Sequence, residues 1–181
     1  MTPEQLRDFY QRQTRALRRR PDLAQRSGQA RARAGGLALE CEVEHEDRTQ
    51  QVAAAIDEGG TGAAPHPGQL LRASIAADLA LGYRTWSARL SIPVHEVEVE
   101  ITCALDARGQ LGLEPAVAVG WQRVAIETCL HSDAPTADLQ RLVETVQRSS
   151  PMLANLSPAI ERAHHLRIVR SQVLEGTPRS V

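Results

Sequence analysis

The stretch 65–90 is predicted to form one long helix, and no other feature constrains the fold of this chain as strongly. Its apolar residues recur at helical spacing, and Pro67 lies in the first turn, where a proline is tolerated. The glycine- and proline-rich segment 57–67 is predicted to be a loop that leads into it. Asp78 lies in the middle of the apolar stretch, with no lysine or arginine one helical turn away. What surrounds this carboxylate is the main question that the sequence raises.

Strand-like segments flank the long helix on both sides. Residues 37–44 place leucine, cysteine and valine on one face and alanine and glutamate on the other, which predicts a half-buried strand that returns through 52–56. Residues 97–105 alternate in the same way and precede a second strand region over 117–130. There the apolar positions slip by one residue near Gly120, which predicts a β-bulge.

Further elements are predicted near both ends of the chain. Thr2 opens a capping-box signature for an N-terminal helix that ends before Pro21. Thr136 is predicted to cap a second helix, which Pro151 interrupts because proline cannot continue the backbone bonding of the preceding turn. A last strand is expected within 164–173. Together these elements indicate an α+β domain.

Composition excludes several classes of function. The 181-residue chain has a formal net charge of −1, so nothing global attracts it to nucleic acid or to anionic lipid. It contains no apolar run long enough to span a membrane, and its polar N-terminus does not resemble a secretory signal. Three widely spaced cysteines make no disulfide framework. We therefore expect a cytoplasmic protein that binds neither nucleic acid nor membrane.

An arginine-rich segment precedes the first predicted strand. Nine arginines occur before residue 34, against three acidic residues. A nucleic-acid arm would explain them, but the chain as a whole is not basic. Two interpretations stay open, a solvated helix face and a helix that docks a protein partner.

No catalytic or metal-binding motif is complete in the sequence. Neither a zinc-type spacing of cysteines and histidines nor a nucleophile-elbow serine is present, and we expect no metal and no cofactor. Cys41 and Cys103 lie on the apolar faces of predicted strands, as buried cysteines do. Cys129 stands two residues before His131, which is the one pairing that favours a reactive thiol. From pattern alone, Asp78 either reaches water or meets an arginine from elsewhere, because an unpaired buried charge is very costly.

Two separate strings resemble the OsmC/Ohr family of bacterial stress proteins, which are typically thiol-dependent peroxidases that act on organic hydroperoxides. The first, "GGTGAAPHPGQLLRASIAADLAL", is similar to the glycine-rich loop and central helix of that family. The second, "HSDAPTADLQRLVETVQRSSPMLANL", is similar to its second helix and the following step of cysteine and proline. The resemblance covers about residues 35–170, in the family's order of elements.

The resemblance implies an OsmC-like fold, in which antiparallel sheets wrap around two long central helices of an intertwined homodimer. The boundaries that follow are an N-terminal arginine-rich helix and linker over 1–34, an OsmC-like domain over 35–174 and a frayed tail over 175–181.

The chain departs from the family at its reactive positions. Asp78 stands where the resemblance places the peroxidatic cysteine, and Ser149 and Ser150 stand before Pro151, at the position of the resolving cysteine. Gly68 replaces a glutamate of the hydroperoxide-specific branch. The candidates for the family's activating arginine, which would pair with the Asp78 carboxylate, are Arg31, Arg33 and Arg48.

These departures bear directly on the chemistry. Peroxide reduction needs a thiolate that attacks the O–O bond and a second thiol that resolves the sulfenic acid. The first hypothesis is therefore an OsmC-like protein without peroxidase activity, whose interface pocket binds a small or elongated apolar ligand. The ligand-binding residues of that hypothesis are Ser74, Ile75, Asp78, Ser149, Ser150 and Arg33. The alternative is an enzyme that reduces hydroperoxides or hydrolyses a substrate at a non-standard site, with Asp78 as general base and Ser149, Ser150 or His66 taking part.

Overall fold

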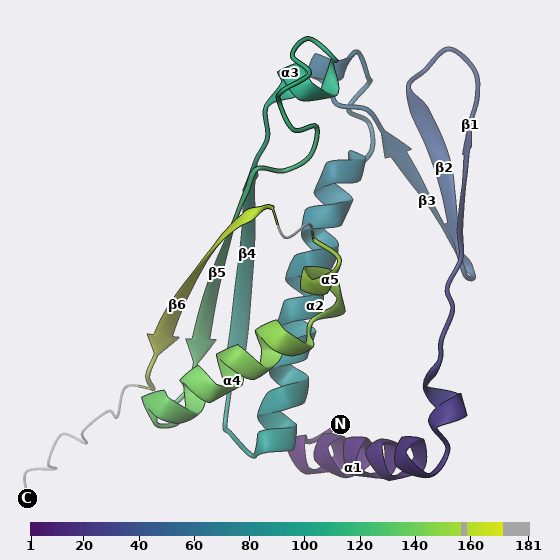
Figure 1. Ribbon diagram of the computed structural model, residues 1–181. Helices are drawn as coiled ribbons and strands as arrows, with labels where there is room; N and C mark the ends of the chain where they lie inside the picture. The colour runs from purple at the N-terminus through teal and green to yellow at the C-terminus, as the bar shows by residue number, and fades with distance from the viewer. Residues whose placement is uncertain (157–158, 172–181) are drawn as a thin grey trace, which may run out of the picture. The chain divides into compact units, whose positions relative to one another are not determined.

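The computed structural model describes residues 1–156 and 159–171 (Figure 1). The chain divides into two compact units, and α2 (Pro67–Leu90) runs through both. One unit comprises Asp8–Ile75; the other comprises Met1–Arg7 with the described part of Ala76–Val181. No helix of the described residues is long and apolar enough to cross a membrane.

The unit Asp8–Ile75 is built around a small antiparallel sheet of three strands in the order β1-β2-β3. Its elements are most of α1 (Pro3–Arg19), η1 (Pro21–Ala24), β1 (Ala30–Ala34), β2 (Glu40–His45), β3 (Arg48–Ala53), η2 (Ile56–Glu58) and the first turns of α2. The predicted capping box of α1 is confirmed, because Thr2 and Gln5 exchange hydrogen bonds between backbone N–H and side-chain oxygen. Every residue of β1 is exposed.

The second unit contains a mixed sheet in the order β4-β5-β6 (Figure 1). Its elements are β4 (Glu96–Ala104), α3 (Ala107–Gln110), β5 (Arg123–His131), α4 (Thr136–Ser149), α5 (Pro151–Ala154) and β6 (Glu161–Val169), together with the rest of α2. β4 and β5 pair antiparallel, with Glu96 opposite His131. β5 and β6 pair parallel, with Arg123 opposite Glu161.

The core of this unit lies where α2, α4 and one face of β5 meet. The large side chains that are fully buried here are aliphatic, except for one tyrosine. They are Leu79, Tyr83, Val124, Ile126, Leu130, Leu139, Leu142 and Val146. Gly82 lets the two helices approach closely, because a Cβ at that position would lie 3.2 Å from Val146 Cγ1. Tyr83 of α2 is hydrogen-bonded to Thr128 of β5, and burial raises the pKa of its hydroxyl while that hydrogen bond lowers it.

The structure corrects four sequence-based expectations. Residues 30–34, predicted as part of a linker, form a strand. The prediction of a bulge near Gly120 is wrong, because β5 begins only at Arg123 and residues 117–122 belong to no strand. Pro135, not Thr136, occupies the N-cap position of α4. The sheets are not all antiparallel, because the helical segment between β5 and β6 is long enough for a parallel return.

The predicted domain boundaries at 34/35 and 174/175 stay predictions. The tail 175–181 lies outside the described residues.

Candidate functional site

Asp78 and Ser150, which come from two separate sequence motifs, meet in the structure. Ser150 Oγ donates a hydrogen bond to Asp78 Oδ2 over 2.5 Å. Asp78 lies on α2 and is half-buried, whereas Ser150 lies between α4 and α5 and is only 5% exposed. The length is typical of a hydroxyl that donates to a carboxylate. The central helix and the end of α4 are therefore joined at the two positions that the sequence singled out.

The local sequence fixes the position of the Ser150 hydroxyl. Pro151 begins α5 at a position where its missing N–H is not needed, and Ser150 before it has extended backbone angles suited to an N-cap. Ser150 Oγ accepts a hydrogen bond from Leu153 N over 3.1 Å. The same oxygen thus caps α5 and donates its proton to Asp78, so both of its hydrogen-bonding roles are occupied.

The other residues predicted for the ligand site are exposed, buried in the core or paired with a different residue. Ser149 is exposed at the end of α4. Ser74 is exposed and its hydroxyl donates to Leu71 O, whereas Ile75 is fully buried. Arg33 forms an ion pair with Glu44 over 2.6 Å within its own sheet. Ser74, Ile75 and Arg33 all belong to the unit Asp8–Ile75, whereas Asp78 and Ser150 belong to the other unit.

Asp78 forms no ion pair with any arginine among the residues that the structure describes, and its hydrogen-bond partner there is Ser150. The candidate arginines Arg31, Arg33 and Arg48 belong to the unit Asp8–Ile75, and their pairing with Asp78 stays a prediction.

His66 performs a structural task at the start of α2. Its Nδ1 accepts a hydrogen bond from Gly68 N over 3.1 Å, and its Nε2 lies 2.9 Å from Glu58 Oε2. Gln69 Oε1 accepts in return from His66 N. The arrangement resembles a capping box, except that a histidine ring replaces the usual hydroxyl and accepts from the second helical N–H instead of the third.

The three cysteines lie on three different strands. Cys41 on β2 and Cys103 on β4 are half-buried, and Cys129 on β5 is buried. Cys103 is opposite Val124, five positions before Cys129 along β5. At about 3.4 Å per residue this separates the two cysteines by roughly 17 Å, well beyond the reach of a disulfide.

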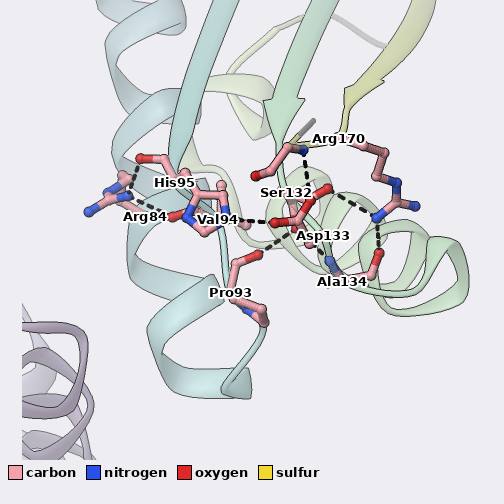
Figure 2. A network of polar contacts seen from close by, with 9 residues as sticks. Arg84, Pro93, Val94, His95, Ser132, Asp133, Ala134 and Arg170 are labelled. Atoms are coloured by element: carbon pink, nitrogen blue, oxygen red, sulfur yellow. Dashed lines mark hydrogen bonds and ion pairs between the residues drawn. The ribbon is translucent and has the colours of Figure 1, made fainter. Parts of the chain in front are cut away.

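Sequence reasoning missed a polar network at the end of the sheet β4-β5-β6 (Figure 2). Arg170 Nη1 donates to the backbone oxygens of Ser132 and Ala134, and Ser132 Oγ donates to Pro93 O over 2.5 Å. Arg84 of α2 donates to Val94 O in the same region. The network ties the start of β4, the ends of β5 and β6 and the start of α4 to one another. Its members are backbone oxygens in large part, so no residue pattern indicates it.

A contact between the side chains of Asp133 and His95 adds to this network. His95 Nε2 lies 3.3 Å from Asp133 Oδ2, while Ser171 N donates to Asp133 Oδ1 over 2.8 Å. The hydrogen bond from Ser171 and, to a lesser extent, His95 hold the pKa of the Asp133 carboxyl below its ordinary value. Both side chains are more than half exposed, so the pair contributes little to stability. In the described part of the chain, no group of three or more His, Cys, Asp or Glu side chains is arranged to hold a metal ion.

Comparison with known proteins identifies the fold and the family. No curated protein sequence is significantly similar to the chain. Among solved structures, an OsmC-like protein from Mycoplasma pneumoniae superimposes with a TM-score of 0.65 at 11% identity, over 80% of this chain and 98% of the other.

Two organic hydroperoxide resistance proteins are similar in structure as well. The protein from Legionella pneumophila has a TM-score of 0.63 at 20% identity, over 78% of this chain and 97% of its own. The protein from Elizabethkingia anophelis has a TM-score of 0.64 at 16% identity, over 80% of this chain and 97% of its own. At these identities the likeness establishes the fold alone. The family model of OsmC-like proteins matches residues 60–164, which is more than half of the sequence. The chain therefore belongs to the OsmC-like protein family.

Proposed function

We propose that this chain is a stress-related protein of the OsmC/Ohr group that has lost thiol peroxidase activity and acts by binding a ligand. The observation that carries the proposal is the hydrogen bond from Ser150 Oγ to Asp78 Oδ2. By the resemblance described above, these residues stand at the positions of the resolving and the peroxidatic cysteine. The two positions are in contact, as a thiol relay requires, but they hold a hydroxyl and a carboxylate in place of two sulfur atoms.

The remaining thiols do not offer a replacement relay. A carboxylate is a poor nucleophile towards peroxide, and a serine hydroxyl forms no disulfide. Cys103 and Cys129 lie too far apart along the sheet to resolve one another. This arrangement supports binding rather than redox turnover as the function.

We further propose that the protein is a homodimer with its ligand site near the subunit interface. Leu71 and Leu81 support this, because they are 46% and 68% exposed on the stripe of α2 that carries Ser74 and Asp78. A partner that covers this stripe would remove both leucine side chains from water, which favours association. The ligand would be a small or elongated apolar molecule that contacts this stripe.

Light scattering during size-exclusion chromatography tests the assembly. The native chain is expected to elute as a dimer, and Leu81→Glu is expected to shift it towards monomer. Leu23→Glu, at a leucine outside α2 that is 56% exposed, is the control and is expected to leave the mass unchanged. A native monomer at micromolar concentration would refute the proposed assembly.

Consumption of an organic hydroperoxide tests the loss of activity. The native protein, supplied with a dithiol reductant, is expected to leave cumene hydroperoxide unconsumed above the rate of the reductant alone. The double variant Asp78→Cys/Ser150→Cys is expected to gain turnover, because it restores sulfur at two positions that are in contact. Turnover by the native protein that disappears in Cys129→Ser would overturn the proposal and assign the chemistry to that thiol.

A hydrolytic enzyme is the second candidate, because a serine hydroxyl donating to a carboxylate also resembles a nucleophile beside its base. Against it, Ser150 Oγ is buried and already caps α5. A fluorophosphonate probe distinguishes the two candidates. Labelling of the native protein that is abolished in Ser150→Ala, and retained in Ser149→Ala, would favour the enzyme.

A further inference from the structure

A cavity of about 320 Å³ lies between the N-terminal residues 1–7 and the end of α2 with the loop that follows it. All of its lining residues belong to the same compact unit, and neither Asp78 nor Ser150 is among them. Its volume is at the lower end of the range for small-molecule sites. The cavity is therefore a separate candidate site, independent of the proposed function above.

One side of the cavity is apolar. Leu6 of α1 faces residues from the end of α2 and the next loop, of which Ala88 is 7% and Ile92 is 5% exposed. Pro93 and Val94 complete this wall. An alkyl or aryl group placed here would be removed from water, which favours binding by about 25 cal/mol per Å² of apolar surface.

Two arginines supply the polar side of the cavity, and each is already held in place. Arg7 Nη1 donates to Ser91 Oγ over 2.9 Å, and Arg84 Nη1 donates to the backbone oxygens of Val94 and His95 over 2.9 and 3.3 Å. Figure 2 shows Arg84 in this position. A guanidinium carries five N–H donors, so each retains donors for a ligand. Among the described residues, neither arginine forms an ion pair with a carboxylate.

The one acidic residue that lines the cavity, Glu4, offsets only part of the charge of the two arginines. Its carboxylate is engaged at the start of α1, where its own backbone N–H and the side chain of Thr2 lower its pKa, with a smaller contribution from Arg7. His95 also lines the cavity. Its Nε2 contacts Asp133, which is not a lining residue. The lining of the cavity thus contains two guanidinium groups and one carboxylate, so its net charge is positive.

We propose that this cavity binds a small monocarboxylate with an apolar body, whose carboxylate contacts Arg7 and Arg84 while its alkyl or aryl part lies on the wall of Leu6, Ala88 and Ile92. Arginine suits this ligand because its planar fork matches the geometry of a carboxylate. The preorganisation of both guanidinium groups reduces the entropy lost on binding.

Isothermal titration of the full chain with octanoate at low ionic strength tests the proposal. Octanol and octylammonium, which have the same alkyl chain without the negative charge, are the matched ligands. Octanoate is expected to bind at least tenfold more tightly than either. Arg7→Gln is expected to weaken octanoate binding tenfold or more, whereas Arg12→Gln, on the same helix but outside the cavity, is expected to leave it unchanged.

Three results would overturn the proposal. They are no octanoate binding up to millimolar concentration, octanol binding as tightly as octanoate, and an Arg7→Gln variant that binds like the native chain. Arg84→Gln also removes the hydrogen bonds to Val94 and His95, so it is not the primary variant. Should Arg7→Gln fail to fold, the three ligands on the native protein still decide the question.

Discussion

Replacing Ser150 with alanine removes one oxygen atom that takes part in two hydrogen bonds. The N-cap bond from Leu153 N is lost, which costs about 1 kcal/mol. The bond to the Asp78 carboxylate is lost as well. A hydrogen bond to a charged group contributes roughly 1.5–3 kcal/mol when buried, but Asp78 is half-buried and water can reach it, so we expect about 1 kcal/mol here. The free energy of unfolding should therefore fall by about 2 kcal/mol.

Urea denaturation followed by circular dichroism measures this difference, at one fixed protein concentration because assembly would add to the apparent stability. Ser149→Ala is the matched control, since that neighbouring serine is exposed and should change the free energy of unfolding by less than about 0.5 kcal/mol. A double-mutant cycle with Asp78→Ala isolates the bond between the two side chains, with an expected coupling of about 1 kcal/mol. If Ser150→Ala is as stable as Ser149→Ala, or if the coupling is zero, the assigned contact is not formed in solution.

Two further predictions concern the same compact unit. Gly82→Val should lower the free energy of unfolding by about 1–3 kcal/mol, because its Cβ would press on Val146 Cγ1, and adding Val146→Ala should restore part of the loss in the same urea assay. Desolvation, with the nearby charges of Arg162 and His165, holds the pKa of His164 below its ordinary value of 6.5. The unfolded chain then binds more protons just below that pH, so stability falls as the solution is acidified through it. His164→Gln should flatten this loss, and an unchanged pH profile would contradict the assignment.

The periodicity of apolar residues was sufficient to predict the helices and strands that bury one face and expose the other. The helix predicted over 65–90 is α2, and the alternation over 97–105 is β4. The strand β1 was not predicted because alanine and arginine alternate along it. One face of the strand carries the charged arginines, and the other carries only the methyl groups of alanine. The loop 117–122 imitates a strand because its apolar residues also alternate, but periodicity does not report whether a backbone finds a partner strand.

The candidate site was predicted only in part for a related reason. The Ser-Pro step before α5 is a local signal for an N-cap, and the resemblance singled out both Asp78 and Ser150. Their mutual hydrogen bond joins residues 72 positions apart, and no local pattern encodes such a contact. The network around Arg170 was invisible for the same reason, since most of its acceptors are backbone oxygens that every residue possesses.

The parallel pairing of β5 with β6 has a consequence for biosynthesis. β5 emerges from the ribosome together with its antiparallel neighbour β4, but its second neighbour arrives only after α4 and α5 have been made. Until then, a strand that carries Val124, Ile126 and Leu130 presents an open edge that another nascent chain can pair with. A chain that stops before Glu161 keeps that edge permanently, so premature termination in this region should yield aggregates rather than a smaller folded protein.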